Sequence, residues 1–305
     1  MRYIHTFSKE VPVSQVALGC MRIGHMSVSE AERYISHALE QGYNYFDHAD
    51  IYGGGACEEV FGKALANLPH LRDKIVIQSK CGIKSGMYDF SKEHIISAVN
   101  GSLKRLGVEK LDVLLLHRPD LLMEPEEVAE AFAYLEHSGK VTAFGVSNHN
   151  PAQIVLLQKY VRQPLCINQM QLSITNATMI SNGANVNTLN ADAVDRDGSL
   201  RDYCRLHDIT IQPWSPLQYG FFEGVFLGNE KFEALNTVIH EVAQAHGVRD
   251  IGIAIAWLLR LPEKMQPIVG SISEKRLEDI AAASEITLTR QEWYAIYRAA
   301  GYPLP

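Results

Sequence analysis

The sequence predicts an α/β protein folded as a (β/α)8 TIM barrel, and three observations lead to this prediction. Eight short runs of strand-forming residues alternate with amphipathic helical segments along the chain of 305 residues. Polar side chains occur at the carboxyl end of one run after another, and in a parallel barrel these ends share one mouth. The first run continues as VALGCMRIGH, which lacks the G-x-G-x-x-G pattern of an open dinucleotide-binding sheet.

The predicted strands are runs rich in Val, Ile, Leu and Phe. Several are continuous enough in apolar residues to be covered on both faces, as parallel strands are. They span residues 16–19, 43–49, 74–80, 111–117, 141–148, 166–172, 210–216 and 266–271. Helices with clear start and stop signals lie between them. For three of these helices the start and stop residues are Ser29 and Gly42, Ser91 and Gly107, and Pro125 and Gly139.

Three segments fall outside the strand–helix units. Residues 1–14 are expected to form a short strand or hairpin that closes the barrel floor, and residues 290–303 a further helix after the last unit. Residues 173–198, rich in Asn, Asp, Thr and Gly, are an insertion after the sixth strand and form either a functional lid or a mobile excursion. Because no linker or repeat divides the chain, residues 1–305 are expected to form a single domain.

The composition excludes several classes of protein. With 47% hydrophobic and 21% charged residues, the chain is expected to be soluble and globular rather than disordered. Its net charge of −7 argues against a nucleic-acid partner, and no apolar run reaches the roughly 18 residues that suggest a membrane-spanning helix. The N-terminus lacks the apolar stretch of a secretory signal, and neither cysteines nor histidines show metal-ligand spacing. We therefore expect a cytoplasmic protein with reduced thiols and no bound metal.

Three of the predicted strand ends carry side chains that are costly to bury. Asp47, Lys80 and His117 each follow an apolar run, and neighbouring strands lie about 4.8 Å apart, so we expect the three side chains to converge. The carboxylate and the ammonium would then pair. Tyr52 follows Asp47 closely enough to fold back over the same mouth.

These four side chains suggest acid–base chemistry. A phenol has a pKa near 10, too high for an efficient acid at neutral pH, and a neighbouring cation lowers it. We therefore interpret Tyr52 beside Lys80 as a proton donor, with Asp47 orienting the lysine and His117 binding a substrate oxygen. Each residue alone also has a structural interpretation: an ion pair, a core histidine or a tyrosine that caps a loop. Their joint occurrence at successive strand ends favours catalysis.

Seven motifs follow one another between about residues 16 and 285, nearly the whole chain. They read FDHADIYGGGACEEVFG, IQSK, LLLHRPD, GVSN, NQMQ, QPWSPL and IVGSISEKRLEDI. Together they resemble the aldo-keto reductase superfamily, and in particular its bacterial-type NADP-dependent oxidoreductases. The resemblance implies a barrel that binds a nicotinamide cofactor across its mouth, with Tyr52 as general acid. It implies that Asp47, Lys80 and His117 complete a catalytic tetrad.

The resemblance also implies which residues bind the nicotinamide half of NADPH. Ser147, Asn148 and Gln169 match the residues that bond the carboxamide. Trp214 matches an aromatic residue that stacks on the nicotinamide, and an indole is suited to that contact. The residues that match the pyrophosphate-contacting stretch are Ser215, Leu217 and Gly220.

A last stretch matches the adenosine-phosphate end of the cofactor site. Its residues are Gly270, Ser271, Ser273, Arg276 and Asp279, the last of them near the adenine. A guanidinium suits a 2′-phosphate, although Arg276 also fits an ordinary solvated helix face. Gly270 replaces a lysine that many family members use for the same phosphate. This difference weakens the preference for NADPH over NADH without reversing it.

The expected activity is NADPH-dependent reduction of an aldehyde or ketone, in which hydride leaves C4 of the nicotinamide as Tyr52 protonates the oxygen. The alternative is an NADP(H)-binding regulatory subunit that senses redox state with little turnover, and the complete tetrad argues against it. The expected partner is a small carbonyl substrate, with no nucleic acid and no membrane. Loops over the mouth are expected to select this substrate. They are residues 21–25, 84–90, 120–124, 173–198 and 218–230. The physiological substrate and the oligomeric state stay open.

Overall fold

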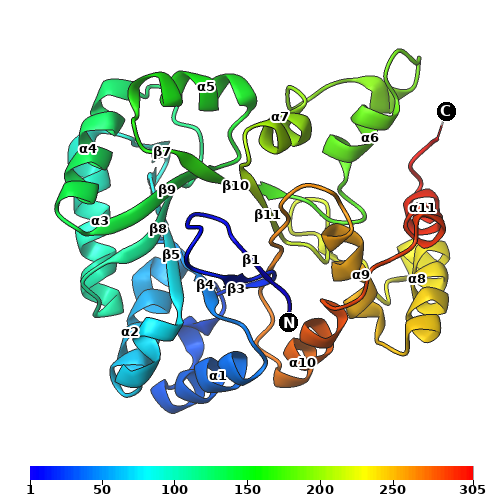
Figure 1. Cartoon of the computed structure of the whole chain (residues 1–305), viewed down its shortest axis with the longest axis horizontal. Helices are drawn as coiled ribbons and strands as arrows, with labels where there is room; N and C mark the ends of the chain where they lie inside the picture. The colour runs from blue at the N-terminus through cyan, green and yellow to red at the C-terminus, as the bar shows by residue number, and fades with distance from the viewer. Residues whose placement is uncertain (305) are drawn as a thin grey trace.

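Eight parallel strands form the central sheet of the computed structural model, which describes residues 1–304 (Figure 1). In the order in which they neighbour one another, they are β11 Thr210–Trp214, β10 Leu165–Gln171, β9 Val141–Ser147, β8 Leu111–Leu116, β5 Val76–Cys81, β4 Tyr45–Asp47, β3 Ala17–Gly19 and β14 Ile268–Val269. A parallel bridge between Ile211 and Met265, with a 3.0 Å hydrogen bond from Gln266 N to Ile211 O, joins the two outer strands. The ring is therefore nearly closed, and the predicted (β/α)8 barrel is confirmed.

Each strand of the barrel is followed by one or two helices that lie outside it (Figure 1). The helices are α1 Val28–Glu40, α2 Ala56–Ala66, α3 Lys92–Leu106, α4 Pro125–His137, α5 Pro151–Tyr160, α6 Thr178–Ala184, α7 Leu200–Leu206, α8 Glu233–His246, α9 Asp250–Leu259, α10 Glu274–Ala283 and α11 Arg290–Ala299. Short 3₁₀ turns are η1 Ile23–His25, η2 Tyr52–Gly55, η3 Pro69–Lys74, η4 Ala191–Ala193 and η5 Glu230–Phe232. The chain that the structure describes contains no helix long and apolar enough to cross a bilayer.

The predicted cap of α1 is wrong by two residues. Ser27, not Ser29, caps this helix: its hydroxyl accepts from Glu30 N, and the Glu30 carboxylate accepts from Ser27 N at 2.8 Å. This reciprocal pair forms because Ser27 has an extended backbone and the glutamate lies three residues later. The other helix signals are confirmed, since Ser91 caps α3 and Pro125 is the first residue of α4.

The N-terminal segment lies under the barrel, as predicted. β1 Tyr3–Ile4 and β2 Val13–Ser14 pair as an antiparallel hairpin. The Ser14 carbonyl accepts from Gln266 Nε2 at 2.8 Å, and Ser14 N donates to Asn44 Oδ1 at 2.7 Å. These contacts attach the hairpin to the amino ends of two barrel strands, opposite the mouth.

The insertion of residues 173–198 packs beside the last helix. It contains α6, and Ala177 N donates to the Tyr302 hydroxyl oxygen at 2.8 Å, just beyond α11. Figure 1 shows α6 near the C-terminus rather than over the barrel. None of its residues lines the cavity described below, so the structure does not show the lid. The helix α11 ends at Ala299, earlier than the predicted residue 303.

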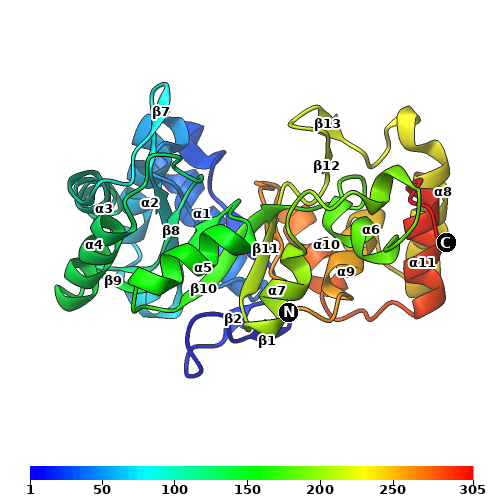
Figure 2. The same cartoon turned by 90° about the horizontal axis from the view of Figure 1, so that it is seen from above.

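Two small hairpins rise from the opposite side of the barrel. They are β6 Ile83–Lys84 with β7 Met87–Tyr88, and β12 Gln218–Tyr219 with β13 Gly224–Val225. Figure 2 shows β7 and β13 projecting on one side while β1 and β2 lie on the other. The hairpins therefore stand beside the mouth formed by the carboxyl ends of the strands.

Candidate active site

A cavity of about 1050 Å³ opens at the carboxyl ends of the barrel strands. At one end it is lined by Asp47, Tyr52 and His117, and at the other by Arg276 and Asp279. A volume at the upper limit of ordinary small-molecule sites leaves room for more than one ligand. Of the residues predicted for the site, most line this cavity. Those that do not are Lys80, Gly220 and Ser273.

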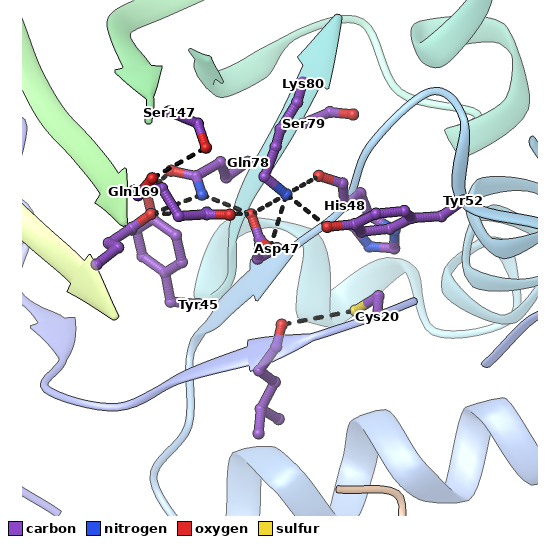
Figure 3. A network of polar contacts seen from close by, with 12 residues as sticks. Cys20, Tyr45, Asp47, His48, Tyr52, Gln78, Ser79, Lys80, Ser147 and Gln169 are labelled. Carbon is purple, nitrogen blue, oxygen red and sulfur yellow. Dashed lines mark hydrogen bonds and ion pairs between the residues drawn. The ribbon is translucent and has the colours of Figure 1, made fainter. Parts of the chain in front are cut away.

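Lys80 lies beneath the cavity, where β5 ends, and organises three oxygen atoms around its ammonium (Figure 3). Its Nζ is 2.8 Å from the Asp47 carboxylate, 2.7 Å from the His48 carbonyl and 3.0 Å from the Tyr52 hydroxyl. An ammonium has three N–H donors, so all three are used. The Tyr52 oxygen accepts one of them, and its own proton is therefore free to point to the cavity.

The turn η2 brings Tyr52 back over the end of β4. Gly53 and Gly54, directly after the tyrosine, have φ values of 59° and 63°. A side chain is strained in this left-handed region, whereas glycine adopts it readily. The glycine run that follows Tyr52 therefore forms a tight turn.

The charges of this cluster differ in one respect from the prediction. Burial raises the pKa of Tyr52 more than the neighbouring Lys80 lowers it, so the phenol stays protonated. Burial lowers the pKa of Lys80, but Asp47 and Tyr52 together raise it by more than burial lowers it. The net shift of the Lys80 pKa is therefore upward. Lys80 lowers the pKa of the phenol, as the sequence predicts, but the prediction did not include the larger opposing effect of burial. The resting state is a neutral phenol beside an ammonium ion.

His117 lines the same end of the cavity as Asp47 and Tyr52, and these three residues define what we name the reacting end. Its ring centroid is 6.1 Å from that of Tyr52, with the rings nearly perpendicular. Burial, Lys80 and Arg118 lower the pKa of the imidazole, so it is neutral. Its buried Nδ1 has no hydrogen-bond partner among residues 1–304. A neutral imidazole carries one N–H donor, which suits contact with a substrate oxygen.

A chain of buried glutamines holds Asp47 from inside the barrel, and sequence reasoning missed it. Asp47 Oδ1 accepts from Gln78 Nε2 at 2.6 Å and from Gln169 Nε2 at 3.1 Å. Both amides also donate to Gln212 Oε1, at 2.9 and 3.2 Å. Gln212 in turn donates to Gln266 at 2.8 Å, which is bonded to the floor hairpin. The available signal was the presence of a glutamine in four of the eight predicted strands.

The residues predicted to bind the nicotinamide half form a second connected group. Asn148 Nδ2 donates to Ser147 Oγ at 2.8 Å, and its Oδ1 accepts from Trp214 Nε1 at 3.3 Å. Ser147 Oγ donates to the Gln169 carbonyl at 2.9 Å. Ser215 and Leu217 line the cavity beyond the indole, whereas Gly220 contributes only its carbonyl, to Gln171. The structure thus brings most of this predicted group together.

The far end of the cavity is more open. Arg276 is exposed, and among residues 1–304 it makes no ion pair. Asp279 is 3.3 Å from Arg249, which also lines the cavity and was not predicted. Arg22 lines it too and donates to the Gly270 carbonyl at 3.2 Å. Arg22 comes soon after the first strand, so the search for polar residues at strand ends could have identified it. The sequence around Arg249 contains no comparable signal.

Comparison with known proteins agrees with this geometry. The family model described as Aldo/keto reductase family matches residues 15–300. The chain is 36% identical to Oxidoreductase YdhF of Escherichia coli (strain K12) over 306 residues, covering 96% of this chain and 95% of that protein. It is 34% identical to 6-dehydroglucose reductase of Agrobacterium fabrum, covering 96% of each.

Solved structures agree in fold. The thermostable aldo-keto reductase Tm1743 superposes with a TM-score of 0.79 at 24% identity, covering 98% of this chain and 100% of that one. An aldo-keto reductase from Klebsiella pneumoniae, solved in complex with NADPH, gives a TM-score of 0.78 at 24% identity, covering 98% of this chain and 94% of that one. The resemblance read from the motifs is confirmed: the chain belongs to the aldo/keto reductase family and is an NAD(P)H-dependent oxidoreductase.

Proposed function

We propose that this protein reduces aldehydes or ketones with NADPH and that Tyr52 protonates the carbonyl oxygen. The observation that carries the proposal is the buried chain from Asp47 through Lys80 to Tyr52, which ends at a large cavity. Such a chain leaves one mobile proton, that of the phenol, facing the space where a substrate would lie. This arrangement suits a general acid.

The cofactor supplies a hydride from C4 of its nicotinamide when it is bound. The Tyr52 hydroxyl donates to the carbonyl oxygen and polarises the bond. As the proton moves to that oxygen, the ammonium of Lys80, 3.0 Å away, stabilises the phenolate that forms. Asp47 keeps the lysine charged and in place, and the neutral His117 offers a second contact to the same oxygen.

The cavity fits a dinucleotide that extends from the reacting end to Arg276. Ser147, Asn148 and Gln169 provide amide and hydroxyl groups at the nicotinamide end, beside the indole of Trp214. The guanidinium of Arg276 has no acidic partner among residues 1–304, and an unpaired guanidinium suits a 2′-phosphate. These features support NADPH over NADH, even though Gly270 supplies no cation.

The names of several relatives support the carbonyl class. Two 6-dehydroglucose reductases, from Agrobacterium fabrum and Novosphingobium aromaticivorans, are 34% and 32% identical to this chain. An L-glyceraldehyde 3-phosphate reductase from Escherichia coli (strain K12) is 26% identical. Each name describes reduction of a carbonyl compound, and the compounds include a neutral sugar derivative and a phosphate.

The test is NADPH oxidation with a panel of aldehydes, ketones and dicarbonyls. The wild type is expected to turn over members of the panel, and Tyr52→Phe to lose about 10²- to 10⁴-fold in kcat while binding NADPH normally. Tyr294→Phe, on an exposed face of α11, is the matched control and should keep full activity. Tight NADPH binding with no turnover would overturn the proposal and favour a redox-sensing regulatory subunit.

A further inference from the structure

Arg118 follows His117 at the carboxyl end of β8 and lines the same cavity. Its side chain is half-buried, and its guanidinium lies 5.5 Å from the centre of the Trp214 ring. The mechanism derived above gives it no role. The question is what a cation does at the reacting end of this cavity.

Among residues 1–304, no carboxylate pairs with Arg118. Five arginines in residues 1–304 are half-buried. Arg72, Arg105 and Arg201 each pair with a carboxylate, at 3.3, 2.8 and 2.9 Å, and Arg260 donates to the Leu288 carbonyl at 2.7 Å. Within residues 1–304, Arg118 has neither a carboxylate nor a hydrogen-bond acceptor within contact distance. Its guanidinium instead lies over the face of the Trp214 ring.

The acidic side chains near Arg118 are already engaged. Asp120, two residues later, accepts from Phe90 N and Leu122 N, both at 2.9 Å. Asp89 is bound to Lys84 at 3.0 Å. Among the acids that line the cavity, Asp47 holds Lys80. At the far end, Asp250 contacts His240 and Asp279 contacts Arg249. No acid of residues 1–304 lies within ion-pair distance of Arg118, so we expect an oxyanion at this position to come from a ligand.

The position of Arg118 indicates which ligand brings that oxyanion. It neighbours His117 in sequence, and Tyr52 is among the groups that perturb its pKa, so it lies close to the two residues that face the carbonyl oxygen. The cation that suits the cofactor phosphate, Arg276, lies at the opposite end of the cavity. A partly desolvated guanidinium binds a carboxylate or phosphate through two parallel hydrogen bonds.

We infer that Arg118 binds an anionic group of the substrate, so that the enzyme prefers aldehydes or ketones that carry a carboxylate or a phosphate near the carbonyl. This inference rests on the proposed carbonyl reductase activity and names the substrate class of the same site. It makes Arg118 a residue for substrate selection, distinct from the groups that transfer the proton.

The test compares matched pairs of substrates that differ in one anionic group. Succinic semialdehyde against butanal tests a carboxylate, and glyceraldehyde 3-phosphate against glyceraldehyde tests a phosphate. In Arg118→Met, kcat/KM for the preferred anionic member is expected to fall about 10- to 100-fold, with the neutral member changed less than about threefold. Arg118→Lys should retain part of the preference for the anionic member, because lysine keeps the positive charge but lacks the two parallel N–H donors of the guanidinium. Arg162→Met, at an exposed arginine outside the cavity, is the control.

Three results would overturn the inference. They are a wild type with no preference for either anionic member, an equal loss for anionic and neutral members in Arg118→Met, and a weakened NADPH affinity in that variant as its main effect. A titration of the NADP⁺ complex with benzoate separates this inference from the proposed activity. If no carbonyl compound is reduced, benzoate binding that Arg118→Met abolishes still supports the anion site. Benzoate binding that is absent, or equal in both proteins, overturns it.

Discussion

The two ends of the cavity differ in how firmly their side chains are held. At the reacting end, Lys80 is fully buried, and all three of its protons have acceptors. At the far end, Arg276 is exposed without an ion pair in the described chain, and Arg249, which contacts Asp279, is 70% exposed. Burial with complete bonding leaves one arrangement, whereas exposed side chains keep several rotamers until a ligand arrives. The reacting end is preorganised, and the far end depends on its ligand.

The largest expected difference between the two ends is in stability. Lys80→Met leaves the Asp47 carboxylate buried without its cation, so the free energy of unfolding should fall by about 3–5 kcal/mol. Arg249→Met removes an exposed partner of Asp279 and should change it by less than about 0.5 kcal/mol. Urea unfolding of both variants at pH 7 measures the contrast. Equal losses would show that the reacting end is not held as described.

Arg276→Met tests the far end through its ligand. Since Arg276 makes no ion pair within residues 1–304, the variant should unfold like the wild type. Its dissociation constant for NADPH should rise about 10- to 100-fold, because a charged hydrogen bond to phosphate is lost. NADH, which lacks the 2′-phosphate, provides the control and should bind equally to both proteins. A parallel loss of NADH affinity would place Arg276 elsewhere on the cofactor.

Gln212→Leu asks whether the glutamine chain holds the reacting end. The change removes the acceptor shared by Gln78 and Gln169 and the donor to Gln266. Buried amides without partners cost about 1–3 kcal/mol in unfolding free energy. We also expect kcat to fall while NADPH affinity is kept, since Asp47 loses its fixed orientation. Gln291→Leu, at an exposed position on α11, should leave both quantities unchanged.

The smallest effect expected near neutral pH is a pH dependence at His48, which is buried against Phe61 with 4.6 Å between ring centroids. Burial and Lys80 lower its pKa from 6.5 to about 3. Between these values the unfolded chain binds a proton that the folded protein does not, so stability falls as pH falls. The contribution is about 1.4 kcal/mol per pH unit. In His48→Leu, the slope of the unfolding free energy against pH should decrease by the equivalent of one proton. The control His70→Leu, at an exposed position, should leave this slope unchanged.

The two ends of the cavity also differ in the kind of sequence signal that predicted their residues. Asp47, Lys80 and His117 were predicted from the apolar runs that precede them, because such runs define where a strand ends and parallel strands end together. The residues of the last stretch were predicted by motif alone: Gly270, Ser271, Arg276 and Asp279 line the cavity, and Ser273 does not. A motif gives only the position of a residue along the chain. Residues in exposed loops or at helix starts have no strand register, so the sequence does not predict which way their side chains point.

By itself, the sequence determined the barrel, its floor hairpin and the strand ends at which Asp47, Lys80 and His117 lie. Hydrophobic runs and capping residues act within a few positions of one another, so they are readable along the chain. Only the tertiary structure decided the remaining features. It joined glutamines from distant strands beneath Asp47, set the net pKa direction of Tyr52 and left Arg118 without an acidic partner among residues 1–304. Each of these depends on burial and on partners far away in sequence.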